Sequence, residues 1–475
     1  MKRIAVIGGG VSGLSAAFSL QKEAAAGTAL EYALFESMTQ FGGVLRTERV
    51  EDCVLEAGPD SFLSEKPWAA ELCRELGIEN QLIGSNDAER KTYMWFRGRL
   101  VPIPDGLMFM VPTKFGPVFS SPLFSWGTRL RIVREWFHRA EQNGGESTVA
   151  EFVERHYGRE MVERIADPLL AGVYGGSADE LSVQAVLPRF AEMEAKFGSL
   201  GKAMIAARKR ADGAEERPLF TSLKNGMQHL TNSLLARIPD VARRPNTPVD
   251  VVKRESGKWL VVSAGRTEEF DGTVLATPAY AAAAILNDNA GLAEELNGIP
   301  YSSSVTVGLI YDRSVRAALP PGFGFLVPRT EGMRILAATF VHNKFPHRAP
   351  ADRAVIRCFL GGSKDEAVLK MSDDEILTLV QSELRQILGG SVQPLVCRVH
   401  RWKHAMAQYG LGHRARVARI GEQLAGISGL ALAGNAYSGI GVPDCVRSGS
   451  EAAAKILADL SLSRQPSVVS HQNGT

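Results

Sequence analysis

The sequence predicts an α/β fold with at least two domains. Two observations point to it: an apolar strand, a glycine-rich turn and a helix open the chain, and a similar strand–turn–helix pattern lies near its end. At 475 residues the chain also exceeds what one hydrophobic core usually serves, and its 45% of hydrophobic residues suffices for more than one core.

The opening pattern indicates nucleotide binding. Residues 4–20 read as a strand, a turn and an alanine-rich helix, and Gly8, Gly10 and Gly13 form a G-x-G-x-x-G turn that also contains Ser12. In such a turn the absent side chains let backbone N–H groups reach a pyrophosphate, and the helix N-terminus adds positive potential.

Glu36 supports the same interpretation. It ends a second predicted strand, about 20 residues beyond the glycines, where an acid accepts hydrogen bonds from an unphosphorylated adenosine ribose. A glycine pattern alone also occurs in ordinary tight turns. With strand, helix and acid in register, the sequence predicts a dinucleotide such as FAD or NAD.

The residues after Glu36 favour FAD. Gly42, Gly43 and Arg46 form a second glycine pair followed by an arginine, and Gly58 and Pro59 come shortly after. At this point the chain resembles the flavin-containing amine oxidase superfamily. The resemblance implies that these residues lie against the diphosphate and ribityl chain of FAD.

The resemblance extends to a late glycine-rich turn before the last predicted helix. In the superfamily this turn approaches the flavin ring, and the helix N-terminus there can stabilise the negative charge of reduced flavin; a plain helix-capping loop is the alternative. The resemblance also implies an adenine-side contact on a middle strand, where plain strand core is the alternative. The implied residues are Gly434, Asn435, Gly441, Val442, Pro443 and, on the adenine side, Val249.

Three further segments resemble protoporphyrinogen oxidases and the bacterial enzymes that oxidise coproporphyrinogen III. They span residues 167–182, 322–328 and 400–413. The resemblance implies Gly172 and Tyr174 in the first segment, and Leu326 in the second, as substrate contacts. Without it, Gly172 reads as part of a turn and Leu326 as a buried strand residue. One departure is Thr92, which stands where some members of the family place an arginine that binds a propionate.

The implied function is an FAD-dependent, oxygen-dependent, six-electron oxidation of a porphyrinogen in heme biosynthesis, with release of hydrogen peroxide. The substrate would be protoporphyrinogen IX or coproporphyrinogen III, and the partners would be that porphyrinogen and dioxygen. Because the cofactor supplies the redox chemistry, no catalytic side chain is assigned. The alternatives are a flavin amine oxidase or carotenoid desaturase-like oxidoreductase, and a non-enzymatic escort or binding protein on a dinucleotide fold.

The predicted domains are a Rossmann-like FAD-binding domain, an inserted α+β substrate-binding domain and a helical insertion. Residues 100–126 combine aromatic and apolar side chains with prolines, so they form either a surface that enters a bilayer interface or a buried packing segment. The expected ranges are 1–83, 217–283 and 397–462 for FAD, 284–396 for the substrate, 84–216 for the helical insertion and 463–475 for a flexible tail.

Composition limits the other partners. With 54 lysines and arginines against 52 acidic residues, the chain offers no general reason to bind nucleic acid. The five cysteines are scattered, which is typical of reduced thiols in the cytoplasm, and the histidines are scattered too, so no metal site is expected. A peripheral contact with the inner face of the cytoplasmic membrane remains an option. The oligomeric state stays open, with a homodimer as one option.

Overall fold

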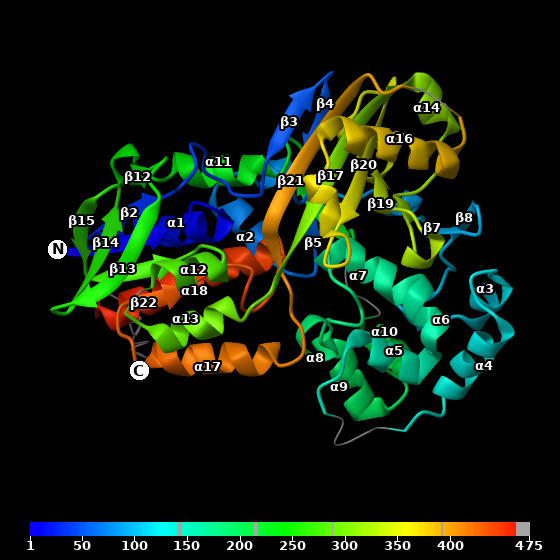
Figure 1. Ribbon diagram of the computed structural model, residues 1–475, viewed down its shortest axis with the longest axis horizontal. Helices are drawn as coiled ribbons and strands as arrows, with labels where there is room; N and C mark the ends of the chain where they lie inside the picture. Colours follow the sequence, from blue (N-terminus) through cyan, green and yellow to red (C-terminus); the bar gives the residue numbers. More distant parts are fainter. Residues whose placement is uncertain (140–144, 212–216, 287, 391–392, 462–475) are drawn as a thin grey trace, which may run out of the picture.

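The computed structural model describes residues 1–139, 145–211, 217–286, 288–390 and 393–461 (Figure 1). The tail expected at 463–475 lies outside these residues. The described residues form two large sheets, four small ones and a group of helices. The sheet that contains the N-terminal strand lies at the opposite end of the molecule from α3 and α4 (Figure 1).

A five-stranded parallel sheet contains the first strand at its centre. Its order is β12-β2-β1-β16-β22, and every pairing is parallel. On β1, Ile4 and Val6 pack into one core while Ala5 and Ile7 pack into another, as the two-residue period of a strand covered on both faces requires. The strands are β1 (Lys2–Ile7), β2 (Leu30–Phe35), β12 (Arg243–Arg244), β16 (Gly272–Leu275) and β22 (Leu430–Leu432).

Helices and small sheets surround this parallel sheet. The two helices that follow the predicted glycine turns, α1 and α18, pack against each other. The helices are α1 (Val11–Ala25), α2 (Trp68–Glu75), α11 (Gln228–Ala236), α12 (Ala279–Ile285), α13 (Ala290–Asn297), α17 (His413–Ala425) and α18 (Val442–Asp459). The added strands are β3 (Thr47–Val50), β4 (Cys53–Glu56), β5 (Phe62–Leu63), β6 (Leu82–Gly84), β11 (Phe220–Leu223), β13 (Val249–Glu255), β14 (Lys258–Ser263) and β15 (Arg266–Phe270).

The second large sheet has seven strands in the order β21-β17-β20-β19-β18-β7-β8. Its apolar face packs with α16, whose first turn is closed by a capping box between Ser372 and Glu375. The elements are β7 (Thr92–Phe96), β8 (Arg99–Pro102), β17 (Tyr301–Asp312), β18 (Gly324–Leu326), β19 (Ile335–Phe340), β20 (Arg353–Gly361), β21 (Val396–Ala407), α14 (Arg313–Ala318), α15 (Val341–Lys344) and α16 (Asp373–Leu388).

Helices dominate the region between residues 107 and 211. Helix α5 begins at a capping box formed by Thr148 and Glu151, and one π-helical turn, η3 (Val162–Ala166), leads into α7. The elements are β9 (Leu107–Met108), β10 (Val111–Pro112), α3 (Phe115–Ser120), α4 (Trp126–Glu135), α5 (Val149–Tyr157), α6 (Arg159–Met161), α7 (Asp167–Tyr174), α8 (Val183–Val186), α9 (Pro188–Phe197) and α10 (Leu200–Ala211).

Strand pairing differs from the predicted domain ranges at two points. Strands β7 and β8 lie inside the range expected for the helical insertion, yet they pair into the seven-stranded sheet. Strand β21, expected in the FAD-binding domain, pairs with β17 in the same sheet. Local periodicity identifies a strand but not its partner, which explains both differences. The rest of the division stays a prediction.

Candidate active site

The turn between β1 and α1 is shaped by its glycines. Gly8 has a φ of +106°, and a Cβ on Gly13 would overlap the carbonyl oxygen of Gly8. A Cβ on Gly10, in contrast, would meet no described atom within 4 Å. Gly10 is the N-cap of α1, and within the described residues no side chain caps this helix and no acid lies in its first turn. The helix N-terminus is therefore open, which suits a pyrophosphate.

Glu36 lies directly beside this turn. It is 9% exposed, and its two carboxylate oxygens accept hydrogen bonds from the backbone N–H groups of Gly9 and Met38, each at 2.8 Å. An ionised carboxylate accepts at about four positions, so capacity remains for a ribose hydroxyl. The N–H of Thr247 donates to the Glu36 carbonyl at 2.7 Å, which brings the segment that leads to Val249 close to this acid.

The second glycine pair packs on the first turn. The N–H of Gly42 donates to the Gly9 carbonyl at 2.8 Å, and a Cβ on Gly43 would lie 3.2 Å from the Cα of Gly10. Both glycines have positive φ, +112° and +58°, so L side chains would be strained there. Arg46 stays next to this pair, because its Nε donates to the Gly43 carbonyl at 3.2 Å.

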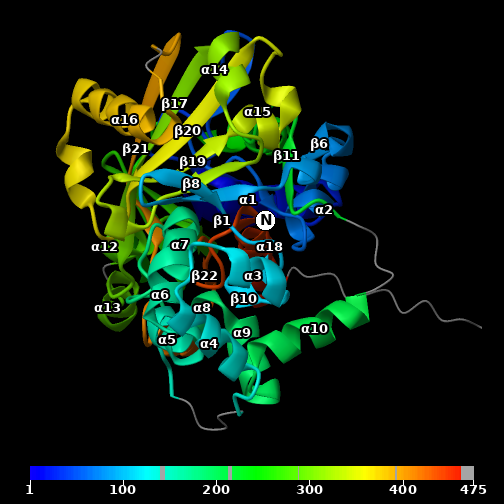
Figure 2. The ribbon, with the colours of Figure 1, turned by 90° about the vertical axis from the view of Figure 1, so that its right-hand side faces the viewer.

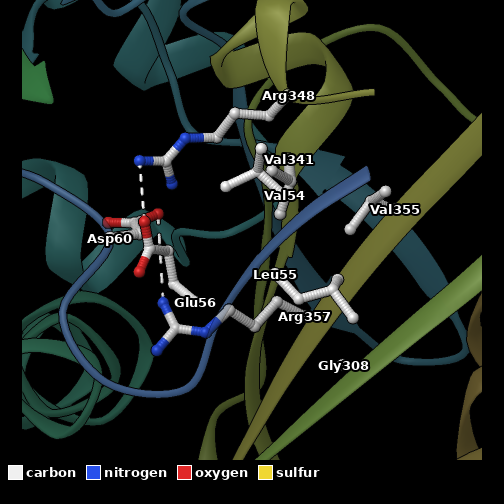
Figure 3. A pocket seen from close by; sticks show the side chains of 9 residues that line it. All are labelled: Val54, Leu55, Glu56, Asp60, Gly308, Val341, Arg348, Val355 and Arg357. Atoms are coloured by element: carbon white, nitrogen blue, oxygen red, sulfur yellow. Dashed lines mark ion pairs between the residues drawn. The ribbon is translucent and has the colours of Figure 1, made fainter. Parts of the chain in front are cut away.

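Buried charges hold the segment that contains Gly58 and Pro59. Figure 3 shows the carboxylates of Glu56 and Asp60 side by side between the guanidinium groups of Arg348 and Arg357. Glu56 pairs with Arg348 at 3.0 Å, with both side chains at most 1% exposed, and Asp60 pairs with Lys344 at 3.1 Å. Burial opposes the charge of Asp60, but Lys344 and Arg357 outweigh it and lower its pKa.

The backbone of this segment is held as well. The Gly58 carbonyl accepts a hydrogen bond from Arg357, and the Ala57 carbonyl accepts one from the Trp402 indole at 2.9 Å. A Cβ on Gly58 would overlap the carbonyl oxygen of Val44. The cavity beside these charges has a volume of about 10 Å³, so it is too small for a flavin or a tetrapyrrole. The surrounding charges therefore hold the segment in place, and the cavity does not accommodate a substrate of that size.

The late glycine turn ends at the N-terminus of α18. Gly441 is the N-cap residue, Val442 and Pro443 form the buried first turn, and the Asp444 carboxylate accepts a hydrogen bond from the Gly441 N–H at 3.2 Å. Lys66 pairs with Asp444 at 2.6 Å. The negative carboxylate offsets part of the positive potential at the N-terminus of α18, which the family resemblance assigns to the stabilisation of reduced flavin. Lys66 compensates the added negative charge.

The first and the late turns lie close together. A Cβ on Gly449 of α18 would overlap the carbonyl oxygen of Ser12 in α1, so the two helices touch backbone to backbone. In the late turn, the N–H of Gly434 donates to the Ser448 hydroxyl at 3.0 Å. Segments more than 400 positions apart thus lie side by side, and the assignment of both turns to one flavin site, which the family resemblance implies, stays a prediction.

The predicted substrate residues come together. The ideal Cβ position of Gly172 lies 3.7 Å from a methyl group of Leu326, so α7 contacts β18 at this point. Figure 2 shows α7 beneath the seven-stranded sheet. The Tyr174 hydroxyl donates to the Val186 carbonyl at 3.2 Å. Burial, with a smaller contribution from Asp444, raises the pKa of Tyr174 to about 12, so it is neutral at physiological pH.

Gln408 and Tyr409 connect the substrate residues to the late turn. The Gln408 amide donates to the Tyr174 carbonyl at 2.8 Å. The Tyr409 hydroxyl donates to the Asn435 carbonyl at 2.7 Å and accepts from the Gly439 N–H at 2.9 Å. Both residues lie in the segment 400–413, the third that resembles porphyrinogen-oxidising enzymes, but they are not among the predicted site residues. Because their partners are distant in sequence, only the shared segment could have indicated them.

Thr92 lies beside the strand that contains Leu326. Strands β7 and β18 pair in parallel, with Thr92 opposite Gly324 and Met94 opposite Leu326. The three cations near Thr92 in sequence are exposed: Arg90, Lys91 and Arg97.

The chain matches a known protein family. The family model for flavin containing amine oxidoreductases matches residues 11–457. The chain belongs to this family. Membership confirms the expectation of FAD and of a flavin amine oxidase-type fold, and the open N-terminus of α1, the carboxylate of Glu36 and the packed glycine turns fit that cofactor. The contacts of individual residues with FAD or with a substrate stay predictions.

Similarity to relatives covers almost the whole length of the chain. A coproporphyrinogen III oxidase of Bacillus subtilis is 30% identical over 466 residues, which cover 97% of this chain and 98% of the relative. Protoporphyrinogen oxidase 2 of Arabidopsis thaliana is 26% identical, and the match covers 97% of this chain and 94% of the relative. A crystal structure from Exiguobacterium sp. 255-15, described as a candidate protoporphyrinogen oxidase, has a TM-score of 0.87 at 29% identity and covers 97% and 99%.

The glycine turn gives a first prediction. We expect Gly13→Ala to lose bound flavin and to lower the thermal midpoint, because its Cβ would overlap the Gly8 carbonyl. Gly421→Ala is the matched control: its Cβ on α17 meets no described atom within 4 Å, so it stabilises the helix by about 0.5–1 kcal/mol. Flavin absorbance and thermal unfolding measure both. Flavin retention in Gly13→Ala would contradict the assignment of this turn.

The buried charge cluster gives a second prediction. Arg348→Met leaves Glu56 buried without its guanidinium, so we expect a loss of about 3–5 kcal/mol in unfolding free energy. Adding Glu56→Gln should restore at least half of that loss, since the uncompensated charge is removed. Arg74→Met, which breaks an exposed pair with Glu79, is the control and should have little effect in urea unfolding. Equal effects of the two arginine variants would refute the interpretation.

Proposed function

We propose that the chain catalyses the FAD-dependent, oxygen-dependent, six-electron oxidation of a porphyrinogen to the porphyrin in heme biosynthesis. The observation that supports it most is the contact between Gly172 and Leu326, two residues from separate segments that the family resemblance assigns to a porphyrinogen. Gln408 and Tyr409 tie this contact to the late turn, on the side expected for the flavin ring. The names of the relatives agree with this reaction.

The proposed reaction removes six hydrogens from the macrocycle. FAD, when bound, accepts two electrons at a time from a bridging carbon as hydride and passes them to dioxygen. Three such rounds balance as one porphyrinogen and three dioxygen molecules giving one porphyrin and three hydrogen peroxide molecules. Aromatisation of the product supplies much of the driving force.

The side chains around the proposed site provide shape and neutral polar groups. Burial raises the pKa of Tyr174 to about 12 and that of Tyr409 well above its usual range. Both hydroxyls therefore stay protonated and donate hydrogen bonds that fix the backbone. Orientation of the substrate against the flavin, rather than acid–base catalysis, is the contribution that this arrangement supports.

Coproporphyrinogen III is the substrate we favour over protoporphyrinogen IX. The relative from Bacillus subtilis is a coproporphyrinogen III oxidase, and so is one from Mycobacterium bovis that is 32% identical over 466 residues. Extra propionates need cationic partners. Arg329 follows Leu326 by three positions and pairs with Asp167 at 3.3 Å, while its buried Nη2 has no hydrogen-bond partner among the described residues. That nitrogen is available to a carboxylate.

A third prediction tests the reaction. The flavin-loaded protein in air should form fluorescent porphyrin from coproporphyrinogen III faster than from protoporphyrinogen IX, and release peroxide. We expect Gly172→Leu to lower kcat/KM at least about tenfold with an unchanged flavin spectrum, because the larger side chain fills the space against Leu326. Gly172→Ala is the control, since its Cβ would make an ordinary contact. Rapid turnover of amines without porphyrin formation would favour the amine oxidase alternative, and flavin binding without turnover of either would favour an escort protein.

We also propose that α3 and α4 bind an anionic bilayer surface from the cytoplasmic side. Among the described residues, no helix is long and apolar enough to cross a membrane. The exposed apolar surface extends beyond the predicted 100–126 stretch, of which Met110, Val111, Val118, Leu123 and Phe124 are buried. It comprises Trp126, Leu130, Val133 and Phe137, which are 40–75% exposed, and it adjoins a groove of about 480 Å³ between the two helices.

Charge supports this surface contact. The segment 114–137, which contains α3 and α4, has four cationic side chains: Lys114, Arg129, Arg131 and Arg134. Its acidic residue, Glu135, is buried. Apolar side chains flanked by basic groups suit the interface of an anionic bilayer. A cytoplasmic location agrees with the five cysteines, which form no disulfide in the structure.

A fourth prediction tests the surface. The protein should float with vesicles that contain phosphatidylglycerol and stay behind with phosphatidylcholine vesicles. The triple variant Trp126→Ser, Leu130→Ser and Phe137→Ser should lose flotation while keeping its flavin. Val241→Ser, at a residue that is 79% exposed on the parallel-sheet side of the molecule, should behave as wild type. Flotation of the triple variant would exclude this surface.

A further inference from the structure

Two histidines meet between three helices of the helical region. His138 follows α4, His156 lies on α5 and Glu194 lies on α9. One ring nitrogen of each histidine and one carboxylate oxygen of Glu194 lie within 4.8 Å of one another. The two rings form an edge contact with centroids 4.4 Å apart. The histidines are 18 positions apart and carry no shared pattern in the sequence, so only the packing of α4 against α5 brings them together.

His156 has the environment of a metal-binding histidine. It is 4% exposed, its Nδ1 lies 3.3 Å from Glu135, and its Nε2 lies 3.0 Å from Glu194. A histidine that binds a metal through one nitrogen usually donates the other N–H to a carboxylate, which fixes the ring. Glu135 is placed for that role, and Glu194 lies where a second metal ligand would stand.

The two carboxylates are themselves fixed. Glu135 accepts hydrogen bonds from the Ser199 hydroxyl at 3.0 Å and from the N–H of Leu200 at 2.5 Å. Arg155 donates three hydrogen bonds to Glu194, at 2.9, 3.1 and 3.3 Å. Such supporting bonds hold ligands in place before a cation arrives.

His138 provides the observation that points to a ligand. Its Nε2 is buried, yet it has no hydrogen-bond partner within the described part of the chain. A buried ring nitrogen without a partner is costly unless something binds it. We propose that His138, His156 and Glu194 bind one divalent cation of the zinc class, which fastens α4 to α5 and α9.

The ligand set favours zinc over magnesium or calcium. Two imidazoles and a carboxylate suit zinc or cobalt, whereas magnesium and calcium prefer oxygen ligands. Bonds of about 2.0–2.1 Å place tetrahedral ligands roughly 3.3 Å apart, so the three atoms must draw closer. Rotation of the partly exposed His138 side chain allows this. The cation displaces the proton between His156 and Glu194, which leaves as H⁺, and water completes the coordination.

The fifth prediction tests this site with the flavin-loaded protein, stripped of metals by a chelator. Zinc titrated calorimetrically should bind the wild type at one equivalent and raise its thermal midpoint, and magnesium should do neither. His138→Ala should weaken zinc binding at least about tenfold and abolish the thermal shift. Its Nε2 has no described partner, so the substitution breaks no described hydrogen bond of that nitrogen. His347→Ala, which removes an exposed histidine outside the helical region, is the matched control and should bind zinc like the wild type.

Two results would overturn the proposal: a wild-type protein that binds no stoichiometric zinc, or His138→Ala binding zinc as tightly as the wild type. Glu194→Gln provides a second variant, and it too should weaken binding. Cobalt gives an independent readout, because a nitrogen-ligated cobalt ion absorbs beyond the flavin bands and should lose that absorption in His138→Ala. These measurements do not depend on porphyrinogen turnover.

Discussion

The buried charges around Glu56 and Asp60 join the segment that contains Gly58 to the seven-stranded sheet and to the turns that precede its strand β20. Glu56 ends β4 and Asp60 lies between β4 and β5. Of their cationic partners, Lys344 ends α15, Arg348 ends the short helical turn Pro346–Arg348, and Arg357 lies on β20 of the seven-stranded sheet. Figure 3 shows the two acids between Arg348 and Arg357. Charges this deep are stable only when they are paired and hydrogen-bonded. Moving this segment away from the three cations would leave the acids uncompensated, so the cluster fixes the position of Gly58 relative to the seven-stranded sheet.

Further contacts hold the two glycine turns and α7 in place. Helices α1 and α18 touch through Gly449 and Ser12, which sets the first and the late turns against each other. Tyr409 then holds the late turn, and Gln408 holds α7 through the Tyr174 carbonyl. The result is an arrangement of neutral hydroxyls, backbone groups and apolar side chains. Such an arrangement orients a bulky substrate and leaves electron transfer to the cofactor.

The sequence predicted what depends on neighbouring residues. The turn at Gly8 to Gly13, the acid at Glu36 and the late turn before α18 are local patterns whose conformations follow from glycine geometry and strand–helix periodicity. The assignment of Gly172 and Leu326 to the substrate came instead from a family resemblance, since neither residue carries a local signal, and their contact with each other was seen only in the structure.

Long-range pairings were beyond the sequence. Nothing near Glu56 indicates that its partner is Arg348, almost 300 positions later, and nothing near His138 indicates that its ring meets His156. The strands at residues 92–102 read as part of the helical insertion, because periodicity shows a strand but not the sheet that receives it. Such contacts are decided by tertiary packing.

Anaerobic reduction of the bound flavin tests the central claim most directly. Coproporphyrinogen III added without oxygen should bleach the flavin absorbance and form porphyrin, with three flavins reduced for each porphyrin, because each flavin accepts two of the six electrons. Admitting air should restore the oxidised spectrum and release peroxide. A flavin that stays oxidised in the presence of the porphyrinogen would contradict the account.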